Sequence, residues 1–142
     1  MARGAAVRLV AAMLGVWVLA GVARAETAKA YTCSFDAGMV HTFENGAFSS
    51  KAAQKLAFEI GDIDFARQSA ALVTPKGKGE LRIVRAIGAN HFLEVITEGF
   101  LNITTIYEAG PSGGPYPAVH SRHFGLLGTP VVSQYRGSCR EQ

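Results

Sequence analysis

The stretch ELRIVRAIGANHFLEVITEGFLNITTIY, residues 80–107, indicates the fold class of this 142-residue chain. In three short runs, apolar residues recur at every second position and polar residues fill the positions between them. The apolar residues are Leu81 and Ile83, then Leu93 and Val95, then Leu101, Ile103 and Tyr107; the polar ones include Arg82, Glu94, Asn102 and Thr104. A period of two is typical of half-buried β-strands and not of helices.

Turn-forming residues separate these runs and others like them along the chain. Asn45-Gly46, Gly77-Lys78-Gly79 and Glu98-Gly99 are typical of hairpins, and residues 108–117 read as a longer loop. Only Ser49–Ala57 is compatible with a short helical turn. The sequence therefore predicts an all-β fold, a small antiparallel barrel or sandwich of about eight strands.

Two cysteines, Cys33 and Cys139, lie near the two ends of the strand-rich region. We expect them to form a disulfide that joins the first strand to the last, because the chain has the features of an exported protein. First and last strands are neighbours in a barrel, so such a bridge favours the barrel over the sandwich.

The first 25 residues have the pattern of a secretory signal peptide. Arg3 and Arg8 precede an apolar run over residues 9–22, and small residues stand at Ala23 and Ala25. We expect cleavage after Ala25, a single β domain over residues 26–142, and a periplasmic or secreted location. The apolar run is shorter than the roughly 20 residues of a membrane-spanning helix, so we expect no membrane span.

Removal of residues 1–25 also changes the charge of the protein. Three of the 14 basic residues lie in that segment, and the 11 that remain balance the 11 acidic residues. A formally neutral domain lacks the basic surface that nucleic acids and anionic membranes require. We therefore expect no nucleic-acid partner.

The stretch PAVHSRHFG, residues 117–125, places two histidines close together and raises the question of a metal or catalytic site. Side chains alternate between the two faces of a strand, so His120 and Arg122 share one face. Ser121 and His123 share the other. The histidines therefore diverge, and neither a zinc site nor a serine–histidine nucleophile pair is expected here.

Asp62 and Asp64 lie on the same side of an extended segment, where a carboxylate pair can serve acid–base chemistry. Such a pair is more commonly a solvated strand end. The chain also offers no strand–turn–helix elbow of the Gly-x-Ser-x-Gly type and no phosphate-binding loop. We therefore expect a protein that is not an enzyme and carries no cofactor and no metal.

The central and C-terminal strands carry polar residues suited to recognition, on an inner or an outer face that the sequence leaves open. The candidate binding surface comprises His91, Asn102, Tyr107, His120, Arg122 and His123.

Two resemblances accompany this interpretation. The run ANHFLEVITEGFLNITTIY, with YPAVHSRHFG and a terminal QYRGSC, resembles small exported bacterial proteins of unassigned function. The YTC of residues 31–33, with a cysteine in the last strand, is similar to the ends of the periplasmic inhibitors of C-type lysozyme. That family would imply a small eight-stranded barrel, closed by such a bridge, that binds lysozyme.

These observations favour an exported, non-enzymatic β-barrel that binds a small ligand or an envelope protein. The alternative is a structural or envelope-stress protein whose surface contacts other envelope components. The lumen discriminates between them, because open space supports ligand binding and filling by Phe58, Phe92 and Phe100 supports a structural role. The ligand, the partner and the oligomeric state remain open at this point.

Overall fold

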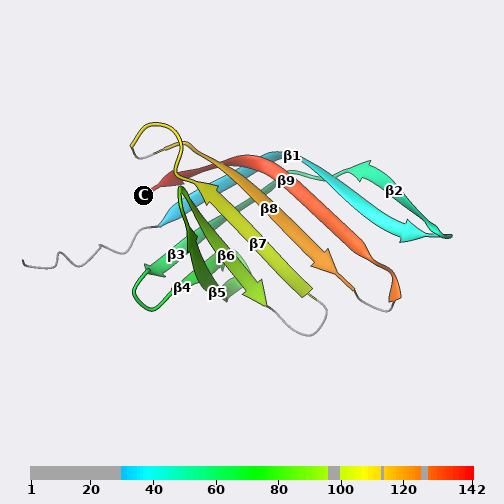
Figure 1. Ribbon diagram of the computed structural model, residues 1–142, viewed down its shortest axis with the longest axis horizontal. Helices are drawn as coiled ribbons and strands as arrows, with labels where there is room; N and C mark the ends of the chain where they lie inside the picture. Colours follow the sequence, from blue (N-terminus) through cyan, green and yellow to red (C-terminus); the bar gives the residue numbers. More distant parts are fainter. Residues whose placement is uncertain (1–29, 96–99, 113, 126–127) are drawn as a thin grey trace, which may run out of the picture.

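The computed structural model describes residues 30–95, 100–112, 114–125 and 128–142, and these residues form nine antiparallel β-strands (Figure 1). The strands are β1 (Tyr31–Glu44), β2 (Ala47–Ala52), β3 (Leu56–Asp64), β4 (Ser69–Thr74), β5 (Gly77–Ala86), β6 (Ala89–Val95), β7 (Phe100–Tyr107), β8 (Tyr116–Phe124) and β9 (Val131–Glu141). Their order is β2-β1-β3-β4-β5-β6-β7-β8-β9, and β1 also pairs with β9. Strand β1 and strands β3 to β9 thus close an eight-stranded barrel, which confirms the predicted fold class.

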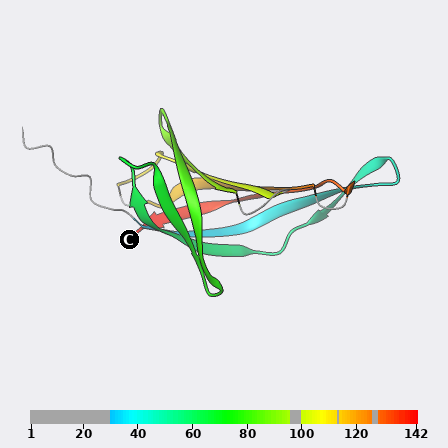
Figure 2. The same cartoon turned by 90° about the horizontal axis from the view of Figure 1, so that it is seen from below.

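The remaining strand, β2, lies outside the barrel because β1 is longer than the barrel wall. Strand β1 pairs with β9 from Tyr31 to Thr42, but with β3 only from Tyr31 to Phe35. Its second half, from Met39 to Glu44, pairs with β2 instead. The β1–β2 hairpin therefore projects beyond the rest of the barrel (Figure 2).

The turn of this hairpin is the predicted Asn45-Gly46 pair, in which both residues have positive φ, 54° and 79°. This is the geometry that two-residue hairpins require. Ser49–Ala57, the one stretch compatible with a short helical turn, contains no helix: β2 continues to Ala52 and β3 begins at Leu56. The unpaired half of β1 offers a ladder of backbone hydrogen bonds, and this pairing overrides the weak local helix preference.

The predicted disulfide is present. Cys33 and Cys139 face each other in the β1–β9 ladder, with Cα atoms 4.0 Å apart and a sequence separation of 106. A loop of this length corresponds to roughly 4–5 kcal/mol of stabilisation in the chain-entropy model. Disulfides form and persist in oxidising compartments outside the cytoplasm.

The bridge lies in a tightly packed apolar core, which we call the disulfide end of the barrel. Its buried side chains are Tyr31, Cys33, Phe35, Ile60, Ile106, Ala118 and Cys139. The β1 and β9 backbones approach so closely here that a Cβ on Gly137 would lie 1.9 Å from the Ser34 carbonyl oxygen. Phe58 and Phe92 are also buried, so large side chains fill this part of the lumen.

Candidate functional site

Strands β6 and β7 turn their polar side toward the inside of the barrel. Glu94, Asn102 and Thr104 are only 9%, 8% and 4% exposed, whereas their apolar neighbours Leu101 and Ile103 are half-buried on the outer face. The period of two thus correctly predicts two different faces. The structure supplies what the sequence left open, namely that the polar face is the inner one.

The strand register aligns four of these inward side chains into one row across the wall. Glu94 on β6 faces Asn102 on β7, Asn102 faces Arg122 on β8, and Arg122 faces Ser133 on β9. We call these four residues the polar row. A second row beside it, on the side of the disulfide end, runs through Thr104, His120 and Tyr135.

His120, in the second row, contacts the polar row through a hydrogen bond to Arg122. Its ring is 3% exposed, and its nitrogens contact Thr104 Oγ1 at 2.8 Å and Arg122 Nε at 3.0 Å. Because Arg122 Nε only donates, His120 Nε2 accepts, and the neutral ring carries its hydrogen on Nδ1 toward Thr104. Burial, with a further contribution from the Arg122 charge, lowers the pKa of His120 to about 3.

Arg122 is therefore held on the inner wall by a neutral histidine. Its Cζ also lies 5.6 Å from the centroid of the Tyr135 ring, within the range of a cation–π contact. The side chain is half-buried. None of the ion pairs among the described residues involves Arg122, so the terminal nitrogens of the guanidinium group are open to a further acceptor.

Asn102 has an oriented amide with one unused atom. Its Nδ2 donates to Glu94 Oε2 at 2.8 Å, and because a carboxylate only accepts, this bond fixes which side of the amide faces Glu94. The carbonyl oxygen Oδ1 points away from Glu94 and is buried without a partner among the described residues. An unsatisfied buried acceptor costs about 1–3 kcal/mol, which a ligand donor would recover.

The Glu94 carboxylate depends on a glycine of the neighbouring strand for its space. A Cβ on Gly79 would lie 2.8 Å from Glu94 Oε1. The absence of a side chain at Gly79 therefore leaves room for the Glu94 carboxylate. None of the ion pairs among the described residues involves Glu94.

Two aromatic side chains lie beyond the polar row, farther from the disulfide. Phe100 and Phe124 face each other across β7 and β8, with ring centroids 4.7 Å apart. Each stands two positions from a member of the polar row, Asn102 or Arg122, and therefore shares its face. Polar row and aromatic pair together form what we call the open end of the barrel.

The six residues of the predicted binding surface divide between two faces. Asn102, His120 and Arg122 are brought together on the inner wall, whereas Tyr107 and His123 are exposed on the outside. His91 lies in the outward-facing register, where its Nδ1 contacts Thr105 Oγ1 at 2.9 Å. The predicted divergence of His120 and His123 is confirmed by their different burial.

Glu94, which lies in the polar row, is absent from the predicted binding surface. The signal that could have identified it is the alignment of polar alternating positions in two consecutive strands. Asp62 and Asp64 have separate basic partners, Lys78 at 2.7 Å and Arg67 at 3.6 Å. No group of three or more His, Cys, Asp or Glu side chains in the described ranges is arranged to hold a metal ion.

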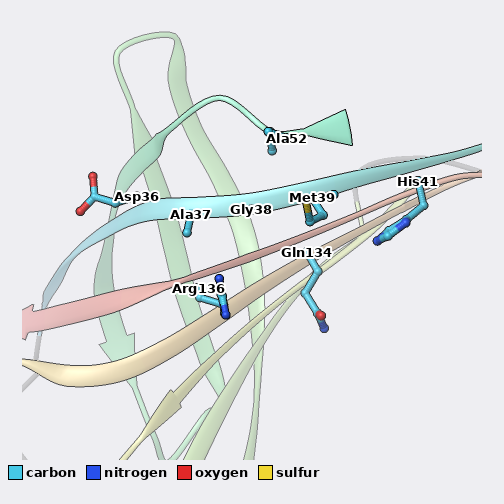
Figure 3. A pocket seen from close by; sticks show the side chains of 9 residues that line it. Asp36, Ala37, Gly38, Met39, His41, Ala52, Gln134 and Arg136 are labelled. Atoms are coloured by element: carbon cyan, nitrogen blue, oxygen red, sulfur yellow. The ribbon is translucent and has the colours of Figure 1, made fainter. Parts of the chain in front are cut away.

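A separate groove of about 470 Å³ lies on the outer face of β1 and β9, next to the β-bulge that follows Phe35 (Figure 3). Small residues line part of it, and His41, Gln134 and Arg136 project from the two strands on one side. This groove is open to solvent, and none of its residues belongs to the predicted binding surface.

Comparison of the chain with models of known protein families finds no match, and comparison with curated proteins finds none. Within the described ranges, the chain has no helix with the length and apolar character of a transmembrane segment. The assignment of function therefore depends on the geometry of the site.

Proposed function

We propose that this protein is an exported, non-enzymatic binding protein that captures a small ligand at the open end of its barrel. The observation that carries the proposal is Arg122, a charged side chain held on the inner wall whose terminal nitrogens have no partner among the described residues. A guanidinium group in this position recognises a carboxylate or phosphate by paired hydrogen bonds.

The contrast between the two ends of the lumen supports a site at the open end only. Buried aromatic and aliphatic side chains fill the disulfide end, including Phe58 and Phe92. Because filling of the lumen by large side chains supports a structural role, we assign such a role to the disulfide end. At the open end, Arg122, Phe100 and Phe124 are half-buried, whereas Glu94, Asn102 and Ser133 are buried.

The chemistry of the site supports binding over catalysis. Both ring nitrogens of His120 are occupied, and with a pKa of about 3 the ring is neutral at physiological pH. It therefore lacks the proton of a general acid, and its one acceptor atom already receives the Arg122 hydrogen bond. Its role in this proposal is to position Arg122.

A contact with other envelope components is the second candidate function, favoured by apolar side chains on the projecting hairpin. Met39, Phe43 and Phe48 are 41%, 38% and 60% exposed. The rings of Phe43 and Phe48 are stacked edge to face, 5.0 Å between centroids. Exposed apolar clusters of this kind often mark protein contacts.

Native mass spectrometry of the protein purified from the periplasm, without refolding, tests the proposal. We expect a small-molecule adduct on the wild type that Arg122→Met abolishes and that Arg136→Met, an exposed arginine on the outer face of β9, leaves unchanged. An adduct lost equally in both variants, or absent from the wild type, would contradict the proposal. A complex with a C-type lysozyme that survives Arg122→Met would instead favour a protein partner.

A further inference from the structure

We infer that the ligand of the polar row is a zwitterion of the α-amino acid class, bound with its ammonium group at Glu94 and Asn102 and its carboxylate at Arg122. The inference rests on the proposed function of this row and adds the chemical class of the ligand.

The first argument is that the row contains two opposite charges that do not neutralise each other. Glu94 is 9% exposed and accepts a hydrogen bond from Asn102, a neutral partner. Arg122 donates to His120, which is also neutral. Charged groups held away from water are stabilised by a counter-charge, and a ligand carrying both signs supplies one to each.

The second argument is the order of the groups along the row. Asn102 lies between the two charges, on β7, and its buried Oδ1 has no hydrogen-bond partner among the described residues. An ammonium group has three donors, enough for Glu94 and Asn102 together. A simple anion satisfies Arg122 alone, and a simple cation satisfies the other two alone.

The third argument concerns spacing. Glu94 and Arg122 stand on strands two apart in the sheet, which corresponds to about 10 Å between backbones. Both residues face the barrel interior, where side chains from different strands converge. The inference therefore takes a compact ligand whose two charges are attached to one carbon atom, in preference to a long ω-amino acid.

The aromatic pair indicates the ligand's side chain. Phe100 and Phe124 lie on the same inner face, one step beyond Asn102 and Arg122. An α-amino acid with its charged end on the polar row directs its side chain toward solvent or toward these rings. An aromatic or branched apolar side chain gains most from that contact.

Calorimetric titration of adduct-free protein with three related probes tests the ligand class. The probes are L-phenylalanine, N-acetyl-L-phenylalanine, which lacks the ammonium group, and L-phenylalaninamide, which lacks the carboxylate. We expect L-phenylalanine to bind about 10- to 100-fold more tightly than either derivative, the usual worth of a charge-assisted hydrogen bond.

Variants assign each charge to its partner. Glu94→Gln is expected to weaken L-phenylalanine by a similar factor and to leave the N-acetyl derivative unchanged, because that derivative has no ammonium group. Arg122→Met is expected to weaken both. The exposed residues Glu44 and Arg136 provide matched controls, as Glu44→Gln and Arg136→Met, and circular dichroism checks that each variant is folded.

The outcomes separate this inference from the proposed function. Equal affinity for L-phenylalanine and its N-acetyl derivative would overturn the zwitterion and retain an anion site at Arg122. No binding of any probe, with a native adduct that still depends on Arg122, would also overturn the zwitterion alone. No binding together with no Arg122-dependent adduct would overturn both.

Discussion

The two ends of the barrel interior are built from the same strands but have opposite chemistry. At the disulfide end, inward positions of β1, β3, β7 and β9 are apolar, fully buried and linked by a covalent bridge. At the open end, inward positions of β6 to β9 hold the polar row beside the Phe100–Phe124 pair. Among the described residues, neither Glu94 nor Arg122 has an ion pair, and Asn102 Oδ1 has no hydrogen-bond partner. If the open end binds the ligand as proposed, stability and recognition occupy separate halves of one lumen, and substitutions in each half should have separable effects.

Loss of the disulfide is expected to give the largest effect on stability. The double variant Cys33→Ser, Cys139→Ser releases a loop of 106 residues and is expected to lower the free energy of unfolding by about 4–5 kcal/mol. Denaturant titration measures this change. A decrease below about 1 kcal/mol would show that the stability of the disulfide end does not depend on the bridge.

A cavity at the disulfide end is expected to have the next largest effect. Ile60 is fully buried, and Ile60→Ala is expected to cost about 3 kcal/mol through lost burial and residual cavity. The affinity of the folded protein for its ligand should remain unchanged. A change in affinity as large as that of Arg122→Met would show that the two halves are coupled.

Low pH is expected to destabilise the protein through His120, which lies between the disulfide end and the open end of the barrel. The folded state protonates His120 only near pH 3, whereas the unfolded chain does so near 6.5. As the pH falls below 6.5, the unfolded state binds the extra proton, so stability decreases, by about 2 kcal/mol between pH 7 and pH 5 from this group.

Unfolding curves at a series of pH values check this dependence in matched variants. His120→Gln should reduce the slope of stability against pH, because glutamine does not titrate and can still accept from Arg122. His123→Gln, on the exposed face of the same strand, should keep the wild-type slope. Equal slopes in the wild type and His120→Gln would contradict the assigned neutral histidine.

The smallest effect on stability is expected at the proposed ligand-binding residue. Arg122→Met removes one hydrogen bond from a half-buried side chain without an ion pair among the described residues. We expect a change of about 1 kcal/mol in the free energy of unfolding, measured by denaturant titration. A loss comparable with Ile60→Ala would indicate that Arg122 serves structure more than binding.

The sequence predicted the closed all-β fold, the Cys33–Cys139 bridge and the opposite orientation of His120 and His123. The alternation of apolar and polar residues predicts the strands and the faces of their side chains, and the turn residues predict the hairpins, both from local sequence. The inward orientation of Glu94 and Asn102 could not be predicted, because a period of two defines two faces without identifying the inner one. That choice is made when the sheet curls and closes through the β1–β9 pairing, which joins strands distant in sequence.

The turn of the projecting hairpin, Asn45-Gly46, was predicted from local sequence, but the projection of the hairpin beyond the barrel was not. Residues 49–52 have weak preferences, and they form a strand only because β1 extends past β3 and leaves an edge to pair with. The length of that extension is a property of the whole sheet.

The most direct test of the central claim is a nuclear magnetic resonance titration with L-phenylalanine and N-acetyl-L-phenylalanine. If the open end is the binding site, backbone amide signals of Asn102, Arg122 and Ser133 shift with added probe. Signals of Cys33, Ile60 and Cys139 at the disulfide end stay in place. Shifts confined to the outer groove or to the β1–β2 hairpin, with the Asn102 and Arg122 signals unmoved, would contradict the account.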